Sequence, residues 1–166
     1  MGVRNCVRDV TWRLKAIFMP PLQKWELCPH SAILFVCKGN ICRSPFAEAY
    51  ALKKVSALGH NKLVVSSGGI NVLSPEAPPD QALKAAELFG LSMESYRSKS
   101  VTQEMIDSHT IVLAMEWAHV KVLCRQFGQS TTVVNLLAGY DPNNRRTGFD
   151  RFNIRDPYGK TMDDFA

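Results

Sequence analysis

Short apolar runs alternate with amphipathic segments along residues 33–137, and this alternation predicts the fold. Each apolar run has four to six residues, the length of a buried strand, and the runs lie at residues 33–36, 62–66, 110–115 and 132–137. Segments with helical spacing of apolar residues lie at residues 46–54, 80–89, 102–107 and 116–127. Strands that alternate with helices predict a parallel sheet with right-handed crossovers, which is an α/β fold.

The segment after the first apolar run has the composition of an anion-binding loop. It joins the first strand to the first helix and reads Cys37-Lys38-Gly39-Asn40-Ile41-Cys42-Arg43-Ser44-Pro45. Gly39 permits a tight turn, and Asn40 tolerates a left-handed backbone conformation. Backbone N–H groups converge at such a junction, where the helix dipole also favours negative charge. Ligands of parallel α/β sheets bind at the carboxyl ends of the strands, where Cys37 lies.

Three side chains of this segment are suited to a reaction at the phosphorus of a phosphoryl group. Nearby amides, a helix N-terminus and a guanidinium all favour the nucleophilic thiolate of Cys37. Arg43 has a planar fork that can hold two oxygens of a phosphoryl group, and Ser44 can donate its hydroxyl to the sulfur. The segment is not a Walker loop, because the Gly-Lys-Ser/Thr ending is missing. A buried structural cysteine beside a solvated arginine is the alternative, which the agreement of strand, loop and helix disfavours.

Composition and charge narrow the class of protein. The length of 166 residues suits one domain, and 46% hydrophobic with 21% charged residues predicts a soluble globular protein. No apolar run is long enough to span a membrane. The net charge is +5, but the basic residues are scattered without interleaved aromatic residues. The charge therefore favours attraction to anionic substrates, and no nucleic-acid partner is expected.

The cysteines and histidines indicate the redox compartment of the protein and whether it binds a metal. The chain has five cysteines, an odd number, without a secretion signal, which predicts free thiols in the cytoplasm. The four histidines are dispersed, at His30, His60, His109 and His119. Because the sequence contains no cluster with metal-ligand spacing, we expect neither a metal nor another cofactor.

Residues 1–31 form a basic N-terminal extension. Five basic residues stand against two acidic ones, a surplus of three positive charges, and the apolar positions are Val10, Trp12, Leu14, Ile17 and Phe18. One interpretation is a basic amphipathic segment that contacts a membrane surface or a partner. The other is a helix packed on its own domain, or a loosely held tail. The short, irregular apolar pattern favours the second, and the arginines interrupt any signal peptide.

The run from Val36 to Ala49 closely resembles the signature of the low-molecular-weight protein tyrosine phosphatases and their relatives, the arsenate reductases and protein-arginine phosphatases. The resemblance implies a three-layer α/β/α fold over residues 32–166, with a four-stranded parallel sheet in the order 2-1-3-4. It implies a phosphatase loop between the first strand and the first helix, with Cys37 and Arg43 catalytic. The phosphate-binding residues would be Lys38, Gly39, Asn40, Ile41, Cys42, Arg43 and Ser44.

Cleavage of a phosphate ester also needs a proton for the departing oxygen, so a carboxylic acid must reach the site. Two Asp-Pro pairs begin at Asp141 and Asp156, and both are candidates. The resemblance selects Asp156, because the family carries the acid in the second pair, followed by a tyrosine, here Tyr158. Asp141 is then a turn residue. The resemblance also implies that Ser67 supports the site, bonding Asn40 or shaping the loop.

Several features depart from the family pattern. Gly159 follows Tyr158, where members often have a second tyrosine, and residues 70–79 contain no aromatic side chain to pack on a phosphotyrosine ring. The segment 96–99 begins with tyrosine where relatives have histidine, and we interpret it as a polar connector. The sequence ends at Ala166 without the amphipathic helix of relatives. We therefore expect exposed apolar surface, unless residues 1–31 cover it or the sequence is a fragment.

The sequence predicts a phosphatase that hydrolyses phosphotyrosine through a phosphocysteine intermediate. Its partners would be phosphotyrosyl proteins, a tyrosine autokinase among them. Protein-arginine phosphatase and arsenate reductase are alternatives on the same fold, although Cys124 is poorly placed for the cysteine relay of a reductase. A catalytically idle phosphoprotein- or anion-binding module is the alternative from another class. Cys42 is either a resolving thiol that forms a disulfide with Cys37 under peroxide, or a packing residue.

Overall fold

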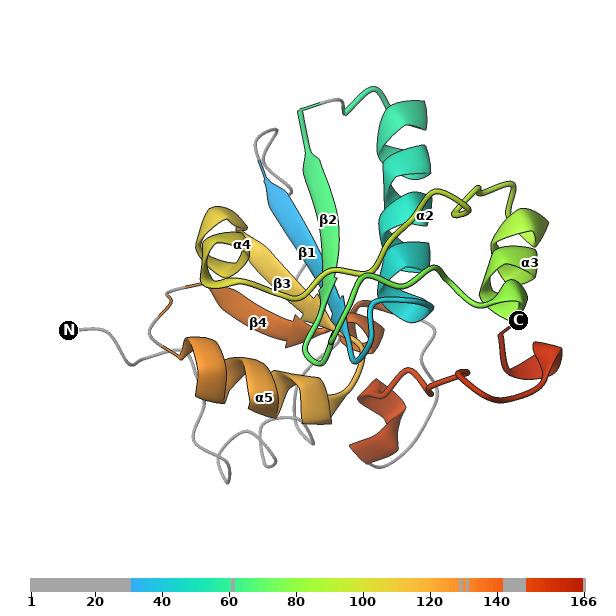
Figure 1. Ribbon diagram of the computed structural model, residues 1–166. Helices are drawn as coiled ribbons and strands as arrows, with labels where there is room; N and C mark the ends of the chain where they lie inside the picture. The colour runs from blue at the N-terminus through green and yellow to red at the C-terminus, as the bar shows by residue number, and fades with distance from the viewer. Residues whose placement is uncertain (1–30, 61, 129, 131, 142–148, 166) are drawn as a thin grey trace.

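The computed structural model describes residues 31–60, 62–128, 130, 132–141 and 149–165. Its strands form a four-stranded parallel sheet in the order β2-β1-β3-β4, which confirms the predicted topology (Figure 1). The strands are β1 (Ala32–Cys37), β2 (Val64–Gly69), β3 (Ile111–Ala114) and β4 (Val133–Leu136). The central strand β1 pairs with both β2 and β3 and carries Cys37 at its carboxyl end.

The predicted helices are present, with small shifts at their ends. They are α2 (Arg43–Ala57), α3 (Asp80–Leu88), α4 (Gln103–Ser108) and α5 (Trp117–Phe127), followed by 3-10 turns at Leu137–Tyr140, Phe149–Phe152 and Met162–Asp164. Helix α2 begins three residues earlier than expected, because Arg43 and Ser44 already have helical conformation and Pro45 suits a first turn. Strand β2 extends to Gly69, which pairs with Cys37.

Alternation of side chains along β1 builds the three layers. Leu34 and Val36 are completely buried against α4 and α5, whereas Phe35 faces α2 on the other side of the sheet. Helix α3 packs on the outer side of α2 through Ala82 and its neighbours. Burying each large apolar side chain contributes roughly 1.5–3 kcal/mol, so β1 is held firmly from both faces. This burial fixes the position at which the loop between β1 and α2 begins.

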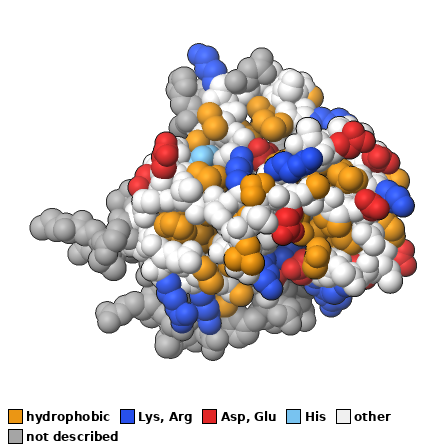
Figure 2. All heavy atoms as spheres, viewed as in Figure 1, with side chains coloured by type: hydrophobic (Ala, Val, Ile, Leu, Met, Phe, Trp, Pro, Cys, Tyr) orange, Lys and Arg blue, Asp and Glu red, His pale blue; other side chains and the backbone are white. Residues whose placement is uncertain are grey.

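The N-terminal extension at residues 1–31, whose role was predicted from the sequence, lies almost wholly outside the described residues, which begin at Ser31. Among the residues that are described, no helix combines the length and apolarity needed to cross a membrane. Figure 2 shows one face of the molecule, on which Lys and Arg side chains are scattered among acidic and apolar ones. This distribution matches the scattered charge of the sequence.

An apolar cavity of about 420 Å³ lies between α2, α3 and the C-terminal segment. Its walls include Phe35 from β1, Met115 directly after β3, Phe46 and Tyr50 from α2, and Phe165 near the C-terminus. The cavity reaches the back of the loop between β1 and α2, since Cys42 and Arg43 also line it.

Candidate active site

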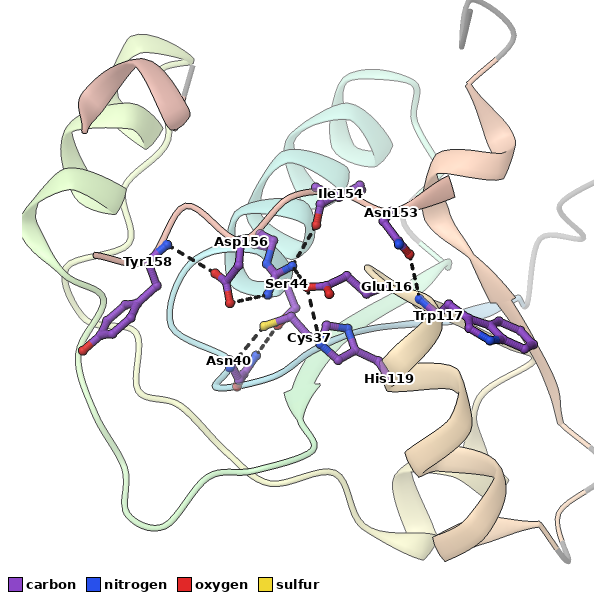
Figure 3. Close-up of polar contacts among 11 residues, drawn as sticks. Cys37, Asn40, Ser44, Glu116, Trp117, His119, Asn153, Ile154, Asp156 and Tyr158 are labelled. Atoms are coloured by element: carbon purple, nitrogen blue, oxygen red, sulfur yellow. Dashed lines mark hydrogen bonds and ion pairs between the residues drawn. The ribbon is translucent and has the colours of Figure 1, made fainter. Parts of the chain in front are cut away.

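The loop between β1 and α2 wraps around the sulfur of Cys37. The Asn40 amide N–H donates to Cys37 Sγ at 3.2 Å, and Ser44 Oγ lies 3.1 Å from the same sulfur (Figure 3). Asn40 has a φ of +54°, the left-handed conformation expected for it, which turns its N–H back toward the sulfur. The hydrogen bond expected between Ser44 and the sulfur is therefore geometrically possible.

Asn40 is the centre of a buried polar network. Its Oδ1 accepts from the Lys99 amide at 2.9 Å and from the Tyr96 hydroxyl at 2.9 Å. Its Nδ2 donates to Ser44 Oγ at 2.8 Å and to Ser67 Oγ at 2.9 Å, so the predicted Ser67–Asn40 bond is present. The interpretation of the segment 96–99 as a polar connector is wrong, because the Tyr96 hydroxyl reaches across to the loop.

Several backbone N–H groups of the loop remain available for an anion. Within the described part of the chain, the amides of Gly39, Ile41 and Cys42 donate to no acceptor. The first N–H groups of α2 add to these donors, at the positive end of the helix dipole. The side chain of Lys38 is exposed, and its carbonyl accepts from the Asn71 amide at 3.0 Å. The loop is thus anchored through its carbonyls while donors stay free.

Gly69 is required where β2 meets the loop. A Cβ atom at this position would lie 2.8 Å from the Lys38 carbonyl oxygen and 3.1 Å from Asn40 Cβ. Because one of these contacts is with backbone, a side chain at residue 69 would displace the loop between β1 and α2.

Arg43 is buried and held by three acceptors. Its Nη1 contacts Glu116 Oε1 and donates to the Ile154 carbonyl at 2.8 Å, while Nη2 pairs with Asp156 Oδ2 at 2.8 Å (Figure 3). The Arg43 side chain is 6% exposed. The sequence reasoning missed Glu116, although its position two residues after β3, at the same sheet edge as Cys37, was a usable signal.

The two candidate acids occupy different places. Asp156 contacts Arg43 directly, and its side chain is 41% exposed, so it faces both the guanidinium and solvent. Its Oδ1 accepts from the Tyr158 amide at 3.2 Å, whereas the Tyr158 ring is exposed and points away from the sulfur (Figure 3). Asp141 ends the turn that follows β4. The geometry favours Asp156 as the acid.

His119 is a buried histidine beside the arginine cluster. It is 3% exposed, its Nε2 lies 3.8 Å from Glu116 Oε1, and its Nδ1 has no hydrogen-bond partner among the described residues. Burial lowers the pKa of His119, against the opposing effect of the Glu116 carboxylate. The imidazole is therefore neutral at neutral pH. The sequence reasoning found His119 only as one of the dispersed histidines.

We expect His119→Asn to flatten the dependence of stability on pH. Because the folded pKa lies below the unfolded value of about 6.5, the unfolded state takes up the proton first on acidification. The native protein accordingly loses stability as pH falls below that value. Urea unfolding at pH 7 and pH 5 should show a smaller loss of stability on acidification in the variant than in the original chain. Equal losses in the two proteins would contradict the neutral, buried imidazole.

Cys42 is a second buried thiol of the loop. Burial, followed by the nearby Cys37 and Asp156, raises the pKa of Cys42 to about 12, so it is a neutral thiol at pH 7. Cys37 and Cys42 are free, whereas Cys124 is disulfide-bonded, so the expectation of free thiols is wrong for Cys124.

The two loop thiols should therefore react at different rates. At pH 7 we expect iodoacetamide to modify Cys37 about tenfold or more faster than Cys42, since only a thiolate reacts readily. Peptide mass spectrometry after brief labelling measures both rates in one sample. Equal labelling of the two cysteines would show that burial does not keep Cys42 protonated.

The site combines groups suited to nucleophilic displacement at phosphorus. A buried thiol lies at the base of a loop of N–H donors, a buried guanidinium follows at the end of the same loop, and a carboxyl group faces both solvent and the guanidinium. In the described residues, no group of three His, Cys, Asp or Glu side chains is arranged to hold a metal ion.

Comparisons with known proteins agree with this geometry. Residues 32–166 match the family described as low molecular weight phosphotyrosine protein phosphatase. The low molecular weight protein-tyrosine-phosphatase Wzb of Escherichia coli K12 is 30% identical over 134 residues, covering 81% of this chain and 82% of Wzb. The protein-arginine-phosphatase of Bacillus subtilis is 31% identical over 131 residues, covering 79% and 82% of the two chains.

Solved structures of relatives have the same fold. The YwlE arginine phosphatase, solved as a mutant with a phosphorylated active site serine, superposes with a TM-score of 0.70 at 30% identity, covering 81% of this chain and 83% of the other. The tyrosine phosphatase AmsI of Erwinia amylovora gives a TM-score of 0.69 at 27% identity, covering 86% and 85%. With its signature loop, its sheet order and these relatives, the chain belongs to the low molecular weight phosphotyrosine protein phosphatase family.

Proposed function

We propose that this protein is a cysteine-dependent phosphatase that hydrolyses phosphotyrosine in proteins. The observation that carries the proposal is the position of Cys37 Sγ, held by Asn40 and Ser44 at the base of a loop with free N–H groups. Tyrosine phosphate is the substrate class of Wzb, Etp and AmsI, to which the chain is similar over about four-fifths of its length.

In the first step, the Cys37 thiolate attacks phosphorus in line with the departing oxygen. The loop amides and the Arg43 guanidinium hold the other phosphoryl oxygens and stabilise the charge of the transition state. The sulfur–phosphorus bond forms as the phosphorus–oxygen bond breaks. Asp156 gives its proton to the departing phenolic oxygen, so that tyrosine leaves as a neutral phenol.

In the second step, water hydrolyses the phosphocysteine. Asp156, now ionised, accepts a proton from the water as the oxygen attacks phosphorus. The electron pair of the sulfur–phosphorus bond returns to Cys37, which leaves as a thiolate. The Asn40 N–H and the Ser44 hydroxyl stabilise this leaving group, and inorganic phosphate departs.

The Arg43–Asp156 ion pair connects substrate binding to acid catalysis. In the free protein, Asp156 occupies Nη2 of the guanidinium. A phosphate oxygen that takes this place removes the cation from Asp156 and adds a negative neighbour. The carboxyl group is then free to face the departing oxygen, where the first step needs it. We assign Tyr158 a supporting role, because its N–H orients the Asp156 carboxylate.

Phosphoarginine is the second candidate substrate, because arginine phosphatases are among the similar proteins. Ile41 in the loop is apolar, and residues 70–79 supply no carboxylate except Glu76. An uncharged aryl ring suits a pocket edge formed by Ile41 and residues 70–79 better than a guanidinium does, because a guanidinium prefers acidic partners. The composition of these residues favours phosphotyrosine.

The test compares hydrolysis of p-nitrophenyl phosphate, phosphotyrosyl peptides and phosphoarginyl peptides by the full chain at mildly acid pH. A higher kcat/KM for phosphotyrosyl peptides supports the proposal. A higher kcat/KM for phosphoarginyl peptides would mean that phosphoarginine is the substrate instead. A folded chain that binds inorganic phosphate without hydrolysing any substrate would be an anion-binding module instead. We further propose that the protein acts in the cytoplasm and that a tyrosine autokinase is among its phosphotyrosyl partners.

A further inference from the structure

Exposed basic side chains lie around the candidate active site, on the loop between β1 and α2 and on two segments that contact it. Within the described residues, four of them are exposed and form no ion pair: Lys38, Lys99, Arg155 and Lys160. We propose that these four cations bind carboxylates on both sides of the phosphorylated residue, so that the substrates are acidic phosphotyrosyl segments of proteins. The inference rests on the proposed function and deepens it by naming the class of substrate.

Lys38 supplies the first of the four cations, directly after Cys37. Its backbone carbonyl accepts from the Asn71 amide at 3.0 Å, which holds the chain in place, while its side chain is exposed. Burial is the main cause of the lowered pKa of His119, and the charges of Arg43 and Lys38 add to it. The Lys38 ammonium group is therefore within electrostatic reach of the site.

Lys99 supplies the second cation, beside Asn40. Its backbone N–H donates to Asn40 Oδ1 at 2.9 Å, and its carbonyl accepts from the Gly69 amide at 2.9 Å. The backbone of Lys99 is thus tied both to the loop and to the end of β2. Its side chain is exposed and makes no hydrogen bond or ion pair with another described residue. Anchoring of the backbone keeps this ammonium group near the loop.

Arg155 and Lys160 lie on the segment that carries the candidate acid. Arg155 stands between Ile154, whose carbonyl accepts from Arg43 at 2.8 Å, and Asp156, which pairs with the same guanidinium. The Arg155 side chain is itself exposed. Lys160 follows four residues after Asp156 and is exposed as well. Two cations therefore border the site on the side of Asp156.

The three segments that carry the four cations contain little negative charge. Residues 37–44, 96–100 and 153–160 include six basic residues and one acidic residue, Asp156. Asp156 pairs with Arg43, so its carboxylate does not neutralise the exposed cations. Such a surplus of positive charge complements an acidic partner and attracts it from solution.

Carboxylates from other segments leave this surplus in place. Glu116 also pairs with Arg43, and Glu48 accepts from Ser67 at 2.6 Å. Glu76, on the loop after β2, is exposed and opposes the surplus with one negative charge. Because the loop amides and Arg43 hold the phosphoryl group, the four cations remain for anionic groups outside it. In a protein substrate, these groups are the carboxylates of neighbouring side chains.

The test measures kcat/KM of the full chain for two phosphotyrosyl peptides of equal length, one with two glutamates on each side of the phosphotyrosine and one with glutamines instead. The ratio of the two values is the acid preference, in which any change to the chemical step cancels. Lys99→Gln, Arg155→Gln and Lys160→Gln are made singly and together. Lys62→Gln is the matched control, because Lys62 is exposed and precedes β2, at the opposite end of the sheet from the loop. Thermal unfolding of each variant confirms that it folds.

We expect an acid preference of about tenfold at low ionic strength, since opposite charges strengthen binding and speed association. It should fall about two- to fivefold in each single variant, approach one in the triple variant, and stay unchanged in Lys62→Gln. Raising sodium chloride from about 20 mM to about 500 mM should abolish it, because salt screens exposed charges. Equal kcat/KM values for the two peptides, or a preference that the triple variant retains, would overturn the inference and leave the proposed function in place.

Peptide binding to Cys37→Ser provides a readout that needs no turnover. Fluorescence anisotropy gives the affinity for the acidic phosphopeptide, for its glutamine counterpart, and for the acidic peptide without phosphate. Tightest binding of the acidic phosphopeptide supports the inference, whereas equal affinity for the unphosphorylated peptide would indicate a general attraction to polyanions and overturn it. A chain that hydrolyses neither peptide but keeps the acid preference in binding would overturn the proposed function and leave the inference in place.

Discussion

Cys37→Ser abolishes hydrolysis of p-nitrophenyl phosphate, with a loss in kcat of at least about 10⁴-fold, and the variant slowly accumulates a phosphoryl group at residue 37. A serine hydroxyl stays protonated at neutral pH, so its attack on phosphorus is slow. Once formed, the oxygen ester does not release its phosphate, because an alkoxide is a far poorer leaving group than a thiolate. The YwlE arginine phosphatase mutant with a phosphorylated active site serine shows that this fold can hold such a species.

Two measurements check this expectation. Release of p-nitrophenol gives the loss in rate, and intact-protein mass spectrometry detects the mass of one phosphoryl group. Retained affinity for inorganic phosphate serves as the control that the loop amides and Arg43 still form the anion site. Activity within tenfold of the original chain would mean that Cys37 is not the nucleophile.

Asp156→Asn should lower kcat for phosphotyrosyl peptides by about 10²–10⁴-fold, the range associated with loss of a general acid. The loss should be smaller for p-nitrophenyl phosphate, because p-nitrophenol leaves more readily without protonation. Affinity for inorganic phosphate should stay the same or increase. Asparagine is neutral and cannot pair with Arg43 as an anion, so phosphate no longer competes with a carboxylate for Nη2.

Steady-state kinetics with both substrates and phosphate inhibition constants separate these effects. Asp141→Asn is the matched control, since it removes the other candidate carboxylate, which ends the turn after β4. A larger loss for Asp141→Asn than for Asp156→Asn would transfer the acid role to Asp141. Weaker phosphate binding in Asp156→Asn would contradict the competition for Arg43.

The sequence predicted those parts of the site that lie in one local segment. Cys37, Arg43 and Ser44 are close because a single strand–loop–helix unit carries them, and apolar periodicity located that unit. The sheet order followed from the family resemblance. The helix starts were less accurate, because the loop geometry at Arg43 and the cap at Glu116 move the boundaries by one to three residues.

The residues that were missed come from distant segments. Tyr96 lies 56 residues from Asn40, and Glu116 lies 73 residues from Arg43. Tyr96 lies outside any periodic pattern, Glu116 stands only at the edge of one, and a polar residue in a connector is usually solvated. Only the fold brings Tyr96 across the end of β2 and Glu116 to the sheet edge. Burial of His119, which lowers its pKa, likewise depends on packing that no local pattern encodes.

The position of β1 at the centre of the sheet also has a consequence for refolding. Its partners β2 and β3 begin 32 and 79 residues after Ala32 in the sequence, so the strand that carries the nucleophile is docked by non-local pairing. Such pairing is slow, because loop closure precedes the contacts that compensate for it. After dilution from denaturant, helical circular dichroism should therefore return before hydrolytic activity, and catalytic turnover becomes a reporter of the last folding phase.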